Sequence, residues 1–283
     1  MMLPASTGIH VRGRLRAPPH AGLKKKTSIV RDTLAILLAL VLTPGLAAAV
    51  RAQEPGPMAA RLSAEKVGGV EPGSYSAGEK LAFSIDPYGD KFLLRFDGNP
   101  EAFVLTGDRV ALGGRVLKYD TGATVLRISI WGGMTLYTDS SPEGLPVTRT
   151  GDFTSPPREP VSEAELLAAL NDKAAHLTYV DQMHLRFSAG DVAGGEQARA
   201  LAFDALANAQ TGIERLVATS SGRQAFSRKI DSVRIVEGAK PGLTLSGRTL
   251  LVHFVPADAE AGRASSRAVS QELGKLLAIN EPG

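Results

Sequence analysis

The stretch Lys91-Phe-Leu-Leu-Arg-Phe-Asp-Gly-Asn-Pro-Glu-Ala-Phe-Val-Leu-Thr106 decides the fold class of the region around it. In an extended strand, Phe92, Leu94 and Phe96 lie on one face because they are two residues apart. The next four residues, Asp97-Gly-Asn-Pro100, favour a turn, and an apolar run resumes after them. The stretch therefore predicts two strands joined by a short turn.

The same alternation of short apolar runs and turn residues extends over residues 79–150. Leu126, Ile128 and Ile130 again share one face of an expected strand. Short strands at regular spacing favour an antiparallel β meander, folded as a small sandwich or a partly open barrel. The expected strands are Leu81–Asp86, Lys91–Phe96, Ala102–Thr106, Arg115–Tyr119, Thr124–Ile130 and Met134–Thr138.

The period of the apolar residues changes after a Pro-rich segment, and we place a linker at residues 151–161. Ser162 and Glu165 form the S-x-x-E capping box that precedes a helix. A second helix is expected over Glu196–Thr219, with an Ala-rich stripe. Because we expect a short Gly-rich connection, the two helices should pair as an antiparallel αα-hairpin.

A β-β-α unit is expected to complete an α+β module over residues 162–283. Ser232–Glu237 and Thr249–Val255 are the expected strands, and the final helix runs over about Gly262 to Ile279. The second strand is apolar almost throughout, which predicts a central position in its sheet.

The first 52 residues have the pattern of a secretion signal. Lys24-Lys-Lys26 gives a positive segment, Leu34–Leu42 is apolar, and Val50-Arg-Ala52 fits a small-x-Ala cleavage site before Gln53. Ala47-Ala-Ala49 is a second possible cleavage site, and an uncleaved anchor is the alternative. Cleavage would leave no stable membrane span. Residues 53–78 are expected to be a flexible arm.

Residues 1–52, the expected secretion signal, account for the net positive charge of the chain. The whole chain has 32 Lys and Arg and 29 Asp and Glu, and residues 1–52 hold eight and one of these. The remainder therefore carries 24 basic and 28 acidic residues, which does not favour nucleic-acid binding.

The absence of cysteine excludes disulfides, thiol catalysis and thiolate metal sites. We expect a periplasmic or secreted bacterial protein.

Two turn sequences, Lys118-Tyr-Asp-Thr-Gly122 and Trp131-Gly-Gly133, and the stretch Tyr88–Pro100 carry a resemblance to a known family. In these segments the chain resembles an uncharacterised family of exported bacterial proteins, and the similarity covers most of the chain after the leader. The resemblance implies an exported mixed α and β protein. It implies no activity, ligand or site.

Histidines supply the weak catalytic candidates. On a helix, His176 and His184 would lie about 12 Å apart along the axis, too far to share one metal ion. Asp181, His184 and Ser188 have the residue types of nucleophilic hydrolysis, but a helical Ser lacks the exposed turn that such a nucleophile uses. His184, Asp181 and His253 are retained as weak candidates beside the simpler interpretation of a polar helix face.

Turn carboxylates supply weak calcium candidates, Asp86 and Asp90. Both lie in the expected turn Asp86-Pro-Tyr-Gly-Asp90, and oxygen ligands suit Ca²⁺. Local hydrogen bonding already explains Asp in turns. No metal or other cofactor is therefore predicted.

Aromatic residues supply the expected ligand-binding side chains. Trp131, Tyr137 and Tyr88, with Tyr119, would form a small exposed platform for a sugar or a peptide, or else pack in the core.

These observations favour a non-enzymatic binding or structural module of the bacterial cell envelope. Its partner would be an unidentified envelope component or a second copy of the chain. The alternative is an envelope hydrolase acting on peptidoglycan or polysaccharide. His184 or His253 would then meet carboxylates from the β-module at a site between the two modules.

Overall fold

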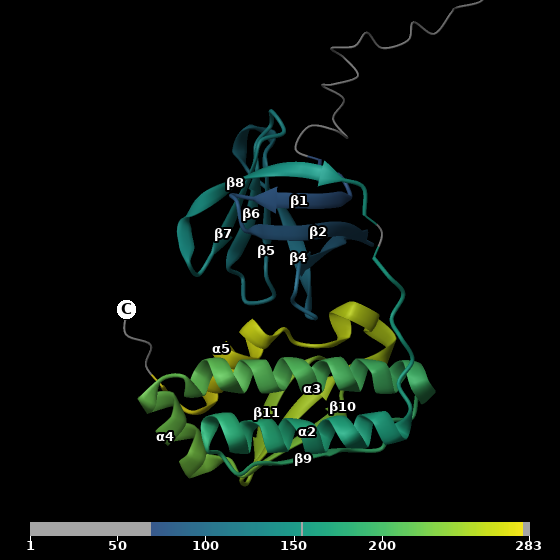
Figure 1. Cartoon of the computed structure of the whole chain (residues 1–283), viewed down its shortest axis with the longest axis vertical. Coiled ribbons are helices and arrows are strands. Elements are labelled where there is room, and N and C mark those ends of the chain that lie inside the picture. Colours follow the sequence, from purple (N-terminus) through teal and green to yellow (C-terminus); the bar gives the residue numbers. More distant parts are fainter. Residues whose placement is uncertain (1–68, 154, 280–283) are drawn as a thin grey trace, which may run out of the picture. The chain divides into compact units, whose positions relative to one another are not determined.

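The computed structural model describes residues 69–153 and 155–279. The expected secretion signal lies outside these residues. The described residues all belong to one compact unit, Glu54–Gly283, which contains a β-barrel followed by an α/β module (Figure 1).

The barrel is a closed antiparallel meander of eight strands in sequence order. The predicted meander is confirmed, but it is neither a sandwich nor partly open, because β1 pairs with both β2 and β8. The strands are β1 (Gly73–Ala77), β2 (Leu81–Tyr88), β3 (Lys91–Phe96), β4 (Ala102–Arg109), β5 (Arg115–Lys118), β6 (Thr124–Ile128), β7 (Met134–Thr138) and β8 (Ser141–Gly151). A short 3₁₀ turn, η1 (Ala111–Gly113), connects β4 to β5.

The first and last strands correct the sequence interpretation. Residues 73–77 were assigned to the flexible arm, but they form β1, in which Tyr75 and Ala77 are buried. Pro142 and Pro146 suggested a domain boundary, yet both lie in β8. Pairing of β8 with β1 begins only at Val147, so both prolines occupy a part of β8 that is paired on one side. An edge tolerates the missing N–H of proline.

Five aromatic rings cross the barrel core as a continuous series. Tyr75, Phe83, Phe96, Phe103 and Tyr119 follow one another with ring centroids 5.2–6.2 Å apart. Tyr119 ends the series and is buried, so it belongs to the core and not to an exposed platform. Such contacts add to the burial of the rings.

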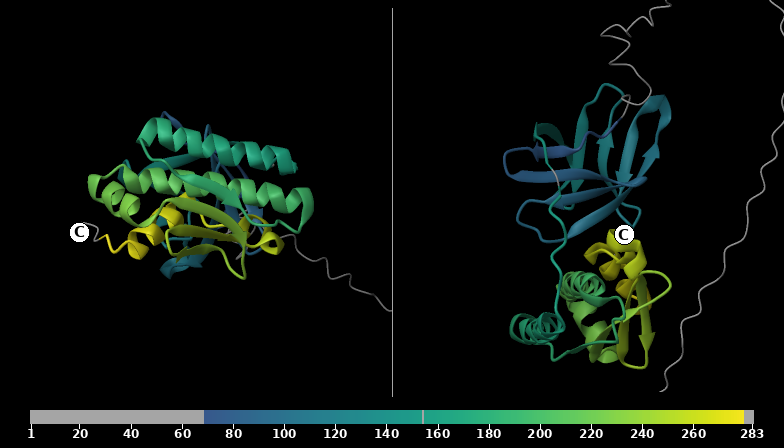
Figure 2. Two further views of the ribbon diagram at one scale, coloured as in Figure 1. Left: turned by 90° about the horizontal axis from the view of Figure 1, so that it is seen from below. Right: turned by 90° about the vertical axis from the view of Figure 1, so that its right-hand side faces the viewer.

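The α/β module contains a four-stranded sheet in the order β11-β12-β10-β9, covered on one face by helices (Figure 2). Strands β9, β10 and β12 are parallel, and β11 is antiparallel to β12. The inner position of β12 confirms its predicted central place. The elements are α2 (Glu163–Asp181), β9 (Arg186–Ala189), α3 (Gly195–Val217), α4 (Ser220–Lys229), β10 (Ser232–Glu237), β11 (Gly242–Ser246), β12 (Thr249–Phe254), η2 (Pro256–Gly262) and α5 (Ser266–Leu276).

The prediction that the first two helices are joined directly as an αα-hairpin is wrong, because a strand lies between them. Helix α2 begins with the predicted capping box, but it ends at Asp181, where Gln182 adopts a left-handed conformation with φ of 56°. Strand β9 then enters the sheet before α3 begins, although α2 and α3 do pack together.

The Ala-rich stripe of α3 is buried within the chain, so it is not a free face for a second copy. Ala198, Ala205 and Ala209 are each at most 3% exposed. Gly212 brings α3 close to α5, since a Cβ there would lie 2.4 Å from Cγ1 of Val269. This close approach positions the N-terminus of α5 next to the barrel.

Candidate functional site

Three carboxylates at one end of the barrel hold the N-terminus of α5. Glu101 lies in the β3–β4 connection, Asp120 in the β5–β6 turn and Asp139 in the β7–β8 turn. In an antiparallel meander, these alternate connections share one end of the barrel. They contact the three consecutive residues Ser265–Arg267.

Glu101 makes the most buried of these contacts. Its Oε1 accepts a hydrogen bond from the backbone N–H of Ser266 at 2.7 Å, and its Oε2 accepts one from the Ser266 hydroxyl at 2.6 Å. Glu101 is 8% exposed and Ser266 is fully buried. Burial raises the pKa of Glu101, although the two bonds from Ser266 and the positive charges of Arg263 and Arg215 act against this rise.

Asp120 holds the neighbouring residue in the same way, but from an exposed position. It accepts hydrogen bonds from the backbone N–H of Ser265 at 2.8 Å and from the Ser265 hydroxyl at 2.6 Å. Ser265 is also the N-cap of α5, because its hydroxyl oxygen accepts a bond from the N–H of Ala268.

Asp139 pairs with Arg267 through both carboxylate oxygens, one of them 2.8 Å from Nη1. This hydrogen bonding lowers the pKa of Asp139. The guanidinium of Arg267 lies 4.7 Å from the centre of the Tyr119 ring, and burial raises the pKa of Tyr119 to about 12. Arg215 of α3 is a further cation, 3.7 Å from Asp139.

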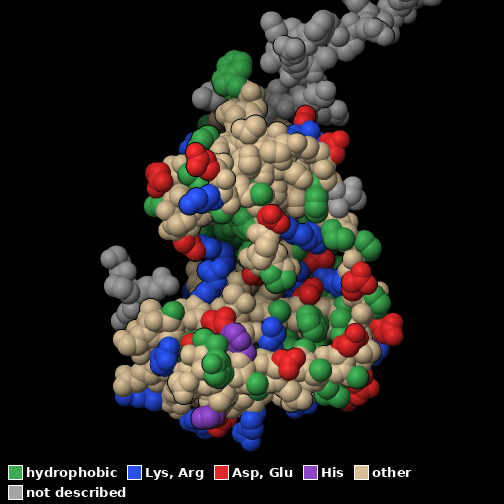
Figure 3. All heavy atoms as spheres, in the orientation of Figure 1, with side chains coloured by type: hydrophobic (Ala, Val, Ile, Leu, Met, Phe, Trp, Pro, Cys, Tyr) green, Lys and Arg blue, Asp and Glu red, His purple; other side chains and the backbone are tan. Residues whose placement is uncertain are grey.

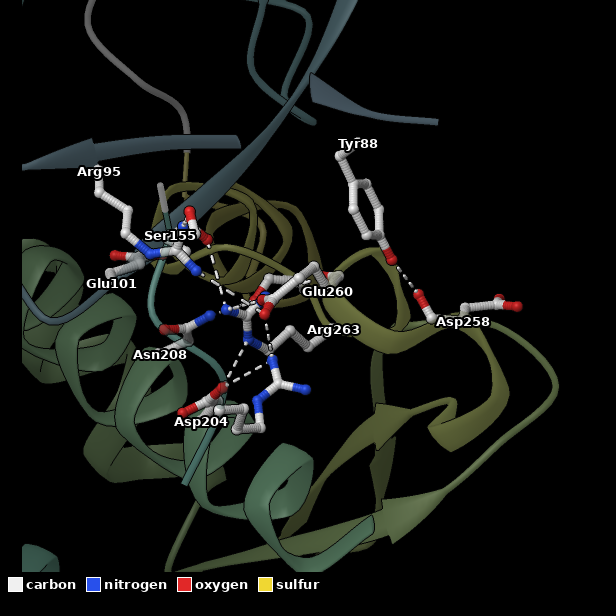
Figure 4. A network of polar contacts seen from close by, with 12 residues as sticks. Tyr88, Arg95, Glu101, Ser155, Asp204, Asn208, Asp258, Glu260 and Arg263 are labelled. Atoms are coloured by element: carbon white, nitrogen blue, oxygen red, sulfur yellow. Dashed lines mark hydrogen bonds and ion pairs between the residues drawn. The ribbon is translucent and has the colours of Figure 1, made fainter. Parts of the chain in front are cut away.

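A second group of charges lies between the barrel, α3 and η2 (Figures 3 and 4). Glu260 contacts Arg158 at 2.7 Å and Arg263 at 2.8 Å, and Asp204 of α3 lies 3.1 Å from Arg158. Burial raises the pKa of Asp204 against the effect of both arginines. Arg95 of the barrel lies 3.9 Å from Glu260. All of these charges are paired, so the group joins the barrel to the α/β module.

The predicted Asp181, His184 and Ser188 arrangement does not form on a helix. Asp181 is the last residue of α2 and lies 3.6 Å from Arg223, His184 is exposed after the helix, and Ser188 lies in β9. His176, which the helical spacing placed too far from His184 to share a metal ion, lies 2.9 Å from Glu214 of α3.

His253 lines a pocket of the α/β module. The cavity measures about 500 Å³ and is formed by the β10–β11 loop, β11, β12 and α5. Nε2 of His253 lies 2.8 Å from the hydroxyl of Thr244. Gly238 leaves room for the imidazole, since a Cβ there would lie 2.9 Å from its Nδ1. Glu272 lines the same pocket, where its carboxylate accepts a hydrogen bond from the N–H of Leu243.

Tyr137 lines a different pocket of about 480 Å³, on the outer wall of the barrel. Gly144 packs behind its ring, because a Cβ there would lie 2.9 Å from Cε1 of Tyr137. Sequence reasoning missed two cations of this pocket, Arg127 and Arg267. Arg127 lies between buried residues of β6, so its place on the outer face of the strand could have been predicted from the alternation. Arg267 comes from α5, and no local pattern predicts that it reaches this pocket.

The other two aromatic candidates lie elsewhere. Trp131 is 83% exposed in the turn between β6 and β7 and is not among the residues that line the Tyr137 pocket. The hydroxyl of Tyr88 donates a hydrogen bond to the carbonyl oxygen of Asp258 at 2.9 Å, a contact with η2 (Figure 4). The structure therefore does not bring Trp131, Tyr137 and Tyr88 together in one pocket.

The two calcium candidates, Asp86 and Asp90, lie in different elements of the barrel. Asp86 lies within β2 and not in a turn, and its carboxylate accepts a hydrogen bond from Ser155, which Arg95 also contacts. Asp90 lies in the β2–β3 turn. In residues 69–153 and 155–279, no three His, Asp or Glu side chains are grouped to hold a metal ion.

Comparison with known families gives one match. A family model described as "Domain of unknown function (DUF4908)" matches residues 57–273. The chain belongs to this family. No curated protein matches the chain, and no solved structure does. Among the described helices, none combines the length and apolar character needed to cross a bilayer.

Proposed function

We propose that this chain is an exported, non-enzymatic binding module of the bacterial cell envelope, and that its ligand is a saccharide bound in the Tyr137 pocket. The observation that carries the proposal is the composition of that pocket. Tyr137 offers a ring fixed from behind by Gly144, and Arg127 and Asp139 lie beside it. Sugars present apolar ring faces and hydroxyl groups, which aromatic rings and planar polar side chains complement.

The pocket has polar groups free to bind a ligand. Arg127 makes no ion pair with a carboxylate of the described residues, and its guanidinium has five donors. Thr124 adds a hydroxyl group, and so does Thr138, whose hydroxyl lies 3.1 Å from that of Ser140. The volume of about 480 Å³ falls within the range of small-molecule sites, about 300–1,000 Å³.

Export is part of the proposal and rests on the leader pattern at residues 1–52. Expression of the full chain in a bacterial host, followed by fractionation and intact-mass measurement, tests it. We expect a periplasmic or extracellular product that begins at Gln53. A full-length cytoplasmic product would contradict the proposed export.

Calorimetric titration of the chain with chitotetraose and with soluble peptidoglycan fragments tests binding. We expect Tyr137→Ala to weaken binding about tenfold, from the loss of one aromatic contact. Tyr179→Ala removes a ring that is 84% exposed on α2 and should leave binding unchanged. Equal affinities for the original chain and Tyr137→Ala would refute the pocket assignment.

The hydrolase alternative receives less support from the contacts. Glu101, Asp120 and Asp139 are the carboxylates that the barrel presents to the α/β module, and each is bound by Ser266, Ser265 or Arg267. His253 shares its pocket with one carboxylate, that of Glu272, and the adjoining cavity brings Glu272 and Asp120 together. Release of soluble products from peptidoglycan, abolished by His253→Ala, would support the hydrolase and refute the non-enzymatic proposal.

A further inference from the structure

We propose that the His253 pocket and the cavity beside it form a second site, which binds a small amphipathic anion: a carboxylate or phosphate head with a short apolar chain. The two cavities adjoin, because Pro241 and Glu272 line both. They share no lining residue with the Tyr137 pocket. The inference therefore stands apart from saccharide binding.

Two lysines give the His253 pocket its positive charge. Lys240 lies in the β10–β11 loop and Lys275 in the last turn of α5, and both line the cavity. Neither has an ion pair with a carboxylate of the described residues, and Glu272 is the single acidic residue of the lining. That carboxylate already accepts a hydrogen bond from Leu243. An anionic head group is the chemistry that two such ammonium groups attract.

His253 and Thr244 add polar side chains beside the lysines. Their side chains are 2.8 Å apart, so each fixes the orientation of the other. Gly238 behind the imidazole and the cross-strand position of Thr244 hold the pair in place. A head group in the pocket would meet an oriented ring and hydroxyl, which is the arrangement of a formed site.

An apolar path leads away from these polar groups. Leu276 is 38% exposed at the pocket, and Leu243 and Pro241 lie beside it. The adjoining cavity, of about 230 Å³, has Ala102, Val104 and Ala264 in its wall, and the charged side chains of Lys91, Asp120 and Arg263 also line it. A chain of methylene groups would cover this surface, and its burial is favourable.

Calorimetric titration of the full chain with octanoate, octyl phosphate, 1-octanol and hexanoate tests the site. We expect octanoate and octyl phosphate to bind, and the tighter of the two identifies the head group. Two further buried methylenes should make octanoate bind about sixteenfold more tightly than hexanoate, since each contributes roughly fourfold. Binding of 1-octanol with the affinity of octanoate would overturn the proposal.

Variants separate the head-group and chain contributions. The double variant Lys240→Ala/Lys275→Ala should weaken octanoate about tenfold and leave saccharide binding unchanged. Lys173→Ala/Lys229→Ala, on α2 and α4, removes the same charge and should have no effect. Val104→Phe should reduce the preference for octanoate over hexanoate. Equal losses in the two double variants would refute a local anion site.

Discussion

Replacement of Glu101 by Ala tests the contact between the barrel and α5 most directly. The change removes two hydrogen bonds to Ser266, of 2.7 and 2.6 Å, and leaves a buried N–H and hydroxyl without a partner. Hydrogen bonds to a charged acceptor contribute about 1.5–3 kcal/mol each. The substitution also removes the free-energy cost of burying the Glu101 carboxylate, which offsets part of this loss. We expect the free energy of unfolding to fall by about 3 kcal/mol.

Asp120→Ala is the matched control for this change. Asp120 makes the same pair of bonds to Ser265, at 2.8 and 2.6 Å, but is exposed, so water can replace it. We expect a loss of about 1 kcal/mol. Urea unfolding followed by circular dichroism measures both values. If Asp120→Ala costs as much as Glu101→Ala or more, burial does not determine the strength of these contacts.

The pH dependence of Glu101→Gln gives an independent readout. The folded pKa of Glu101 is raised above its ordinary value of 4.5, so the folded state binds this proton more readily than the unfolded state. The stabilisation is therefore complete below pH 4.5 and is lost as pH rises through the folded pKa. Relative to Glu101→Gln, the original chain should lose stability over this window. If the difference in unfolding free energy between the original chain and Glu101→Gln does not change with pH, the pKa of Glu101 is not raised in the folded state.

Four further changes test η2 and the packing around α5. Ala259 has φ of 44° and ψ of −122°, so Ala259→Gly should raise the free energy of unfolding by about 1 kcal/mol in urea unfolding. Gly212→Ala should lower the thermal midpoint strongly, because the new Cβ meets Val269 at 2.4 Å, whereas Gly274→Ala meets nothing within 4 Å and should raise it slightly. Arg267→Lys should cost about 1 kcal/mol in urea unfolding, since lysine cannot pair through two nitrogens with the Asp139 carboxylate. A neutral Gly212→Ala would contradict the close packing of α3 on α5.

Local patterns predicted the strands whose turns are short and rich in Gly. The bounds of β3, β7 and β10 match the sequence interpretation, because alternation of apolar residues and Gly-containing turns specify such strands locally. Strand β1 was missed because its residues, Gly-Ser-Tyr-Ser-Ala, have little apolar content and depend on pairing with β2 and β8. Strand β9 was missed because four residues provide too short a period to separate from a helix.

The site residues were harder to predict because they depend on contacts between distant segments. Tyr137 and His253 were identified by residue type, and each lines a pocket, but Lys240, Lys275 and Arg267 carry no sequence signal that separates them from other cations of the chain. The contact of Glu101 with Ser266 joins residues 165 positions apart. No local periodicity encodes such a pair.

Closure of the barrel has a consequence for how the chain folds during synthesis. Ala77 pairs with Val147, and Ser74 pairs with Gly151, so the ring of strands is completed only by its last member. A nascent chain that ends before β8 leaves both β1 and β7 with unpaired edges, which invite association with other chains. Folding of the barrel is therefore a late, non-local step.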